Sequence, residues 1–201
     1  MTEEGIFYIL AGAIGFVTIY SFDFAALKRV RLAKPVIWAV GGGLIVYSLT
    51  EACLFSQKLG LPSWSFPIGC FLLFFALLFQ IYSLFIALPF RKTYVSTGVS
   101  GKLVKTGMYA LIRHPGVPWF ILLMIALILV SDSFLLLITA PILTLLNLAI
   151  VLTQDKVIFP RLFPGYEDYR SETPMLIPNR KSINAFLKSF HITKNLKEGT
   201  R

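Results

Sequence analysis

Long apolar segments alternate with short polar segments along most of this chain. The apolar segments cover residues 6–27, 35–55, 65–90, 116–130 and 134–153. A helix of about 20 apolar residues is long enough to cross the hydrocarbon core of a bilayer. The pattern lacks the ten-residue segments of alternating hydrophobicity that are typical of a membrane β-barrel. We therefore expect an all-α, polytopic membrane protein with about five transmembrane helices.

The polar segments predict how these helices are connected and oriented. Only Ser131-Asp132-Ser133 separates the last two apolar segments, so we expect these two to form an antiparallel helical hairpin. Lysine and arginine number four in the first polar segment, one in the second, five in the third and nine after Thr153. The positive-inside rule then places the first and third polar segments and the C-terminus in the cytoplasm, with the N-terminus outside.

The composition agrees with a membrane protein of one domain. Hydrophobic residues make up 56% of the chain and charged residues 14%, whereas a soluble domain carries roughly 25% charged residues. We divide the domain into three N-terminal spans (1–90), a core that contains the hairpin (91–178) and a basic tail (179–201). The net charge of +9 is explained by topology and lipid contacts and requires no nucleic-acid partner.

The tail has the pattern of an amphipathic helix. Ile183, Phe186, Leu187 and Phe190 recur at the spacing of one helical face, and the segment 179–201 carries six cations and one anion. Such a helix lies on the surface of the inner leaflet. The alternative is a lid over an active site at the level of the membrane.

Few positions within the apolar segments carry polar chemistry. Asp23, Glu51 and Gln80 fall inside predicted spans, where ionisable groups mark functional sites by default; Asp23 is the better candidate of the two acids because it lies near the cytoplasmic end. Gly41 begins a run of three glycines, which we interpret as a site of close helix packing. Neither a CxxC pair nor a Cys/His cluster occurs, so we expect no metal site.

Two groups of polar and aromatic residues flank the predicted hairpin. The first is Gly107-x-Tyr109 followed by Arg113-His114-Pro115, and the second comprises Gln154-Asp155, Tyr166-x-x-Tyr169 and Thr173-Pro174-x-x-Ile177-Pro178. Together these motifs resemble the isoprenylcysteine carboxyl methyltransferase and phospholipid methyltransferase superfamily over residues 101–178. Members of this superfamily are integral membrane enzymes that use S-adenosylmethionine (SAM).

The resemblance implies which residues form the cofactor site. The SAM-binding residues implied by the resemblance are Gly101, Lys102, Leu103, Val104, Tyr109, His114, Pro115, Gly116 and Val117. We add Gln154, which stands at the position of a family glutamate, and Arg113 on physical grounds. Arg113 would attract the carboxylate of the cofactor. Asp155 is our candidate for the catalytic base, because it is the carboxylate nearest to this group.

The chain departs from the family at three positions. Gln154-Asp155 stands where the family commonly has two glutamates, Ile150 where the eukaryotic prenylcysteine enzymes have an arginine for the acceptor, and Val117 where a tyrosine is frequent. The missing arginine argues against a carboxylate acceptor in particular.

These observations predict methyl transfer from SAM to a lipophilic acceptor that enters from the bilayer, which would be a prenyl-type carboxylate, a lipid amine or a thiol. Apart from this acceptor and membrane lipids, the sequence indicates no obligate protein partner. Two alternatives remain open. One is a membrane-bound reductase of related architecture that uses NADPH, and the other is a non-catalytic scaffold that has lost its glutamates.

Overall fold

A computed structural model of the protein describes residues 3–28, 33–88 and 103–198. The helices are α1 Glu3–Leu27, α2 Ala33–Leu54, α3 Ser65–Ile81, α4 Met108–Leu111, α5 Gly116–Ser131, α6 Phe134–Thr153, α7 Phe159–Leu162, α8 Tyr166–Glu172 and α9 Arg180–Glu198. Two π-helical turns, η1 Tyr82–Ile86 and η3 Gln154–Ile158, continue α3 and α6. No β-strand occurs in the described residues, which confirms the all-α prediction.

Within the described residues, four helices are long and apolar enough to cross a membrane. They are Glu3–Leu27, Lys34–Leu54, Ser65–Ile86 and Phe134–Leu162. The fifth predicted span is the apolar helix α5, which has 16 residues and is therefore about 24 Å long, shorter than the ~30 Å hydrocarbon core. Large apolar side chains such as Phe71 and Phe74 point outward from α3, each more than 60% exposed. This surface is the kind that lipid covers.

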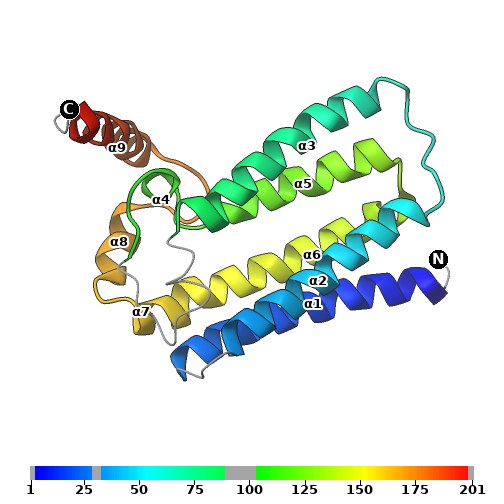
Figure 1. Ribbon diagram of the computed structural model, residues 1–201, viewed down its shortest axis with the longest axis horizontal. Helices are drawn as coiled ribbons and strands as arrows, with labels where there is room; N and C mark the ends of the chain where they lie inside the picture. Colours follow the sequence, from blue (N-terminus) through cyan, green and yellow to red (C-terminus); the bar gives the residue numbers. More distant parts are fainter. Residues whose placement is uncertain (1–2, 29–32, 89–102, 199–201) are drawn as a thin grey trace.

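Figure 1 shows two groups of helices that the α5–α6 hairpin joins. α1 packs along α2 and also contacts α6, while α3 packs along α5. The hairpin turn is tight, because Asp132 ends α5 in the left-handed conformation and Ser133 caps α6 by accepting a hydrogen bond from the amide of Leu136 at 3.1 Å. Met124, Leu136 and Leu143 are fully buried where the hairpin meets the other helices. The predicted hairpin is therefore confirmed.

The close contact between α1 and α2 depends on glycine. A Cβ atom on Gly15 would lie 2.8 Å from the carbonyl oxygen of Gly41, and one on Gly41 would lie 2.9 Å from that of Gly15. Without side chains at this crossing the two backbones approach each other closely. Close packing is thus confirmed at Gly41, whereas Gly42 and Gly43 have open space around the Cβ position.

One end of the bundle brings the two motif groups together. In Figure 1, α4, α7 and α8 lie at the end opposite the N-terminus. There the amides of Arg113 and His114 donate to the carbonyls of Pro174 (2.9 Å) and Met175 (3.2 Å). The hydroxyl of Tyr169 donates to the carbonyl of Tyr109 at 2.5 Å. Residues 60 positions apart in the sequence thus form one unit.

The tail forms helix α9, as predicted. Asn179 and Ser182 start the helix by exchanging hydrogen bonds between side chain and backbone, at 2.9 and 3.0 Å. Ile183 and Leu187 are exposed on the apolar face, while the side chain of Phe190 lies outside the described part. The amide of Gly107, whose φ of 59° suits glycine, donates to Ser189 Oγ of α9 at 3.3 Å. α9 therefore contacts the loop that precedes α4.

Candidate functional site

A cavity of about 530 Å³ opens at the α4 end of the bundle and extends between the apolar helices. Its polar wall residues are Asp23, Lys34, Gln80, Tyr109, Arg113, His114, Asn147, Gln154, Tyr166 and Tyr169. Most of the remaining wall is apolar and comes from α1, α2, α5 and α6. A cavity of this size falls within the range of about 300–1,000 Å³ that is usual for small-molecule sites.

Most residues of the predicted cofactor site line this cavity. They are Leu103, Val104, Tyr109, Arg113, His114, Pro115, Gly116, Val117 and Gln154. Gly101 and Lys102 lie outside the described residues. Asp155 is buried and does not line the cavity. The fold thus gathers the predicted set from the loop before α4, the start of α5 and the end of α6, with Asp155 behind the wall.

Arg113 and Asp155 form a buried, bidentate ion pair. Arg113 Nε donates to Asp155 Oδ1 at 2.8 Å, and Nη2 donates to Oδ2 at 2.9 Å. Arg113 Nη1 donates to the carbonyls of Arg170 and Thr173. These four hydrogen bonds leave one of the five guanidinium N–H donors for a ligand. Arg113 therefore offers a cofactor carboxylate one free donor rather than two, and its contact with the cofactor stays a prediction.

The carboxylate of Asp155 is similarly occupied. Besides Arg113, Oδ1 accepts a hydrogen bond from the Tyr166 hydroxyl at 2.7 Å and lies 3.3 Å from His114 Nε2. Oδ2 lies 3.7 Å from Arg170 Nε. The side chain is only 4% exposed. In this geometry Asp155 holds Arg113 and Tyr166 in place and lies beside His114, while its role as catalytic base stays a prediction.

The two tyrosines of α8 remain neutral hydrogen-bond donors over the ordinary pH range. Burial raises the pKa of Tyr166 well above its usual value, and the hydrogen bond to the Asp155 carboxylate and its charge raise it further. Burial also raises the pKa of Tyr169. The Tyr169 hydroxyl binds the backbone of Tyr109 in the first motif group, whereas the Tyr166 hydroxyl binds Asp155 in the second.

His114 and Pro115 form the junction between the motif and helix α5. The imidazole of His114 stacks on Phe159, with ring centroids 5.6 Å apart and 13° between the planes. Pro115 caps α5 with a φ of −65°, where its missing N–H leaves no hydrogen bond unmade. The ring of His114 is thus held between Phe159 and Asp155 and forms part of the cavity wall.

Gln154 and Asp155 are adjacent in the sequence but serve different partners. Gln154 Nε2 donates to Asp23 Oδ2 at 2.8 Å, across the contact between α6 and α1. The π-helical turn η3 begins at Gln154, and π turns are frequent at functional sites. Gln154 lines the cavity as expected. Asp23, singled out above within the first span, also lines it and is only 6% exposed.

Three residues of the cavity wall were not predicted from the sequence as part of the site. Lys34 was counted as a topology cation, yet it is buried and lies 5.0 Å from the centroid of the Phe22 ring. Phe159 lies beyond the last predicted span and belongs to neither motif group. Gln80 was noted only as a polar residue in a span, and its buried Oε1 has no hydrogen-bond partner among the described residues. An uncompensated polar atom on a cavity wall indicates a place for a ligand donor.

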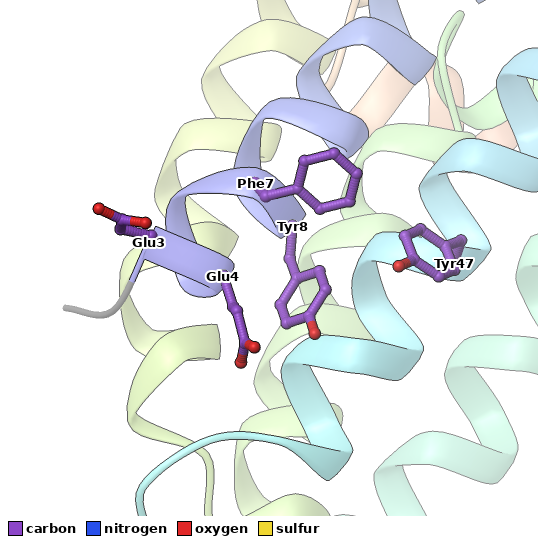
Figure 2. A pocket seen from close by; sticks show the side chains of 5 residues that line it. All are labelled: Glu3, Glu4, Phe7, Tyr8 and Tyr47. Atoms are coloured by element: carbon purple, nitrogen blue, oxygen red, sulfur yellow. The ribbon is translucent and has the colours of Figure 1, made fainter.

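A second pocket, of about 330 Å³, lies at the opposite end of the bundle. Figure 2 shows its wall, formed by two carboxylates and three aromatic rings: Glu3, Glu4, Phe7 and Tyr8 of α1 and Tyr47 of α2. Both glutamates are exposed. This pocket shares no residue with either motif group, so we assign the candidate site to the larger cavity.

Comparison of the chain with protein-family models, curated proteins and solved structures finds no match. The family resemblance therefore rests on the motif residues alone. The function must be inferred from those residues and from the cavity they line.

Proposed function

We propose that the protein transfers the methyl group of SAM to a lipophilic acceptor within the membrane. The observation that carries this proposal is the cavity itself. Its polar end is built from the motifs around Tyr109, His114 and Gln154, and its remaining wall comes from apolar helices. One chamber thus offers polar groups for a charged ligand and an apolar surface for a lipid chain.

The wall residues fit a ligand such as SAM. Phe159, Phe163 and Tyr166 provide aromatic faces for a purine, and the unpaired Oε1 of Gln80 accepts a hydrogen bond from an amine or a ribose hydroxyl. Lys34 supplies a positive charge at the wall of the cavity. When bound, SAM supplies an electrophilic methyl group on a sulfonium.

Methyl transfer of this kind depends on aligning the methyl donor with the acceptor and on excluding water, and the protein need not supply a nucleophile. The ion pair of Arg113 with Asp155, together with the hydrogen bonds of the tyrosines, holds the start of α5 against α8 and fixes the orientation of His114. We propose that this unit faces the cytoplasm, as the distribution of cations predicts, so that SAM enters from the aqueous side and the acceptor from the bilayer.

Calorimetric binding to the purified full-length protein tests the cofactor assignment, with NADPH as the control ligand. We expect SAM to bind, and we expect Tyr109→Ala and His114→Ala to weaken binding at least tenfold because both side chains line the cavity. Binding of NADPH but not SAM would support the reductase alternative. Binding of neither to a folded protein would support the scaffold alternative.

A pair of glycine variants tests the acceptor part of the cavity. A Cβ on either Gly42 or Gly43 meets no atom within 4 Å, but only Gly42 lines the cavity. We therefore expect Gly42→Trp to fill the apolar part and reduce methyl transfer to a long-chain acceptor more than tenfold. Gly43→Trp is the matched control and should leave the rate close to that of the wild type. Equal rates in the two variants would contradict this location of the acceptor.

A further inference from the structure

The wall of the cavity includes a carboxylate, Asp23, that belongs to neither motif group. Asp23 lies on α1, four residues before the helix ends at Leu27. It is 6% exposed and forms part of the cavity wall. A carboxylate within an apolar span is energetically unfavourable and is a functional hypothesis by default.

The hydrogen bonding of Asp23 differs from that of Asp155. Within the described residues, Gln154 donates the only hydrogen bond to the Asp23 carboxylate, and that bond reaches Oδ2. Oδ1 therefore remains available to a ligand in the cavity. Both oxygens of Asp155, in contrast, accept hydrogen bonds from Arg113 behind the wall.

The surroundings of Asp23 suit the head of an amphipathic molecule. Ile19 and Phe16 precede Asp23 by four and seven residues on α1, so they continue the same helical face, and both line the cavity. Ile45 and Leu49 of α2 form an apolar wall of the same chamber. A lipid chain in this part of the cavity would bring its polar head toward the carboxylate.

We propose that Asp23 is the catalytic base of the methyl transfer and that Gln154 positions it; this assignment rests on the proposed function. It applies to an acceptor whose attacking atom loses a proton before it attacks, either a protonated amine (an ammonium group) or a thiol. Asp23 takes that proton, and the lone pair left on nitrogen or sulfur forms a bond to the methyl carbon. The bond from that carbon to the sulfonium of SAM breaks, its electron pair stays on sulfur, and the proton passes from Asp23 to water.

The alternative is a purely structural role for Asp23, in which its hydrogen bond with Gln154 only joins α1 to α6. Asp23→Asn separates the two roles. The asparagine oxygen can still accept the hydrogen bond from Gln154, and the side chain keeps its volume, but an amide cannot take up a proton. Glu51→Gln is the matched control, because Glu51 lies on α2 away from the cavity wall.

The experiment measures transfer of a labelled methyl group from SAM by the full-length protein in lipid nanodiscs. Dodecylamine, dodecanethiol and lauric acid serve as acceptor probes, and SAM affinity is measured in parallel. We expect Asp23→Asn to lower transfer to the amine or the thiol at least 100-fold, as is usual for loss of a general base. SAM affinity should stay within about twofold of the wild type, Glu51→Gln should be fully active, and Asp23→Glu should restore part of the rate.

Three results would overturn the assignment without touching the proposed function: an Asp23→Asn protein that transfers methyl groups at the wild-type rate, one that loses SAM affinity together with activity, or a wild type that methylates lauric acid alone. A carboxylate acceptor is already ionised and needs no base. A folded wild type that binds no SAM would instead overturn the proposed function, and the role of Asp23 with it.

Discussion

The ion pair between Arg113 and Asp155 leads to a quantitative prediction about stability. In Asp155→Asn the side chain keeps its shape, but the negative charge is lost and an NH₂ group faces the Arg113 donors, which lie 2.8 and 2.9 Å from the carboxylate oxygens. The side chains of Arg113 and Asp155 are 7% and 4% exposed, so the small values measured for surface pairs do not apply. Removing one partner of such a buried pair costs about 3–5 kcal/mol.

The expected loss is large enough to measure by thermal unfolding. For a chain of about 200 residues, each kcal/mol shifts Tm by roughly 2–4 °C, so Asp155→Asn should lower Tm by about 6–20 °C. The assay is tryptophan fluorescence of the purified protein in a single detergent. Asp168→Asn is the control, because Asp168 is an exposed acid on α8, and its Tm should stay within about 2 °C of the wild type.

A double-mutant cycle tests whether the two side chains act as a pair. Arg113→Met and Asp155→Leu each leave one buried charge without a partner, whereas the double variant leaves neither. The double variant should therefore be more stable than the sum of the two single losses predicts, by at least about 1 kcal/mol. Additive losses, or an Asp155→Asn protein with the Tm of the Asp168→Asn control, would refute the reasoning.

Two further predictions concern packing and pH. Gly41→Ala should destabilise the protein by about 1–3 kcal/mol, because the added Cβ would lie 2.9 Å from the Gly15 carbonyl oxygen. Gly43→Ala is the control, because the space around Gly43 is open, and this variant should unfold at or above the wild-type Tm in the same assay. Burial and Asp155 raise the pKa of Tyr166 in the folded state. The contribution of Tyr166 to stability is therefore complete below about pH 10. It is lost as the pH rises further, because there the Tyr166 hydroxyl ionises in the unfolded chain but not in the folded one. Tm should consequently fall less steeply above pH 10 in Tyr166→Phe than in the wild type, and parallel curves would contradict this.

The divergence of Gln154 and Asp155 shows what a motif can and cannot predict. The sequence places the two residues together at the end of a span, where the family resemblance expects a pair of glutamates. Adjacent residues on a helix point in directions about 100° apart. Gln154 therefore reaches Asp23 on α1, whereas Asp155 lies behind the cavity wall and binds Arg113. Only the packing of α1 against α6 reveals which carboxylate remains available to a ligand.

The sequence by itself determined the elements of this protein. The ends of the apolar runs predicted Phe134–Thr153 to the residue and the starts of α3 and α5, because a span is defined by local hydrophobicity and by turn residues such as Ser131-Asp132-Ser133. The motifs likewise predicted most of the cavity wall around His114. These features depend on short stretches of chain and on the requirement that backbone groups in lipid pair within one helix.

The tertiary structure alone decided the electrostatic state of the site. Asp23 and Gln154 are 131 residues apart, and Arg113 and Asp155 are 42 apart. Nothing local in the sequence shows which carboxylate accepts hydrogen bonds from which side chain. These pairings depend on how closely the helices approach and on which faces they turn toward one another. The glycine crossing of α1 and α2 and the burial of the Arg113–Asp155 pair set these distances. They leave Asp23, the acid outside both motif groups, as the carboxylate that faces the cavity.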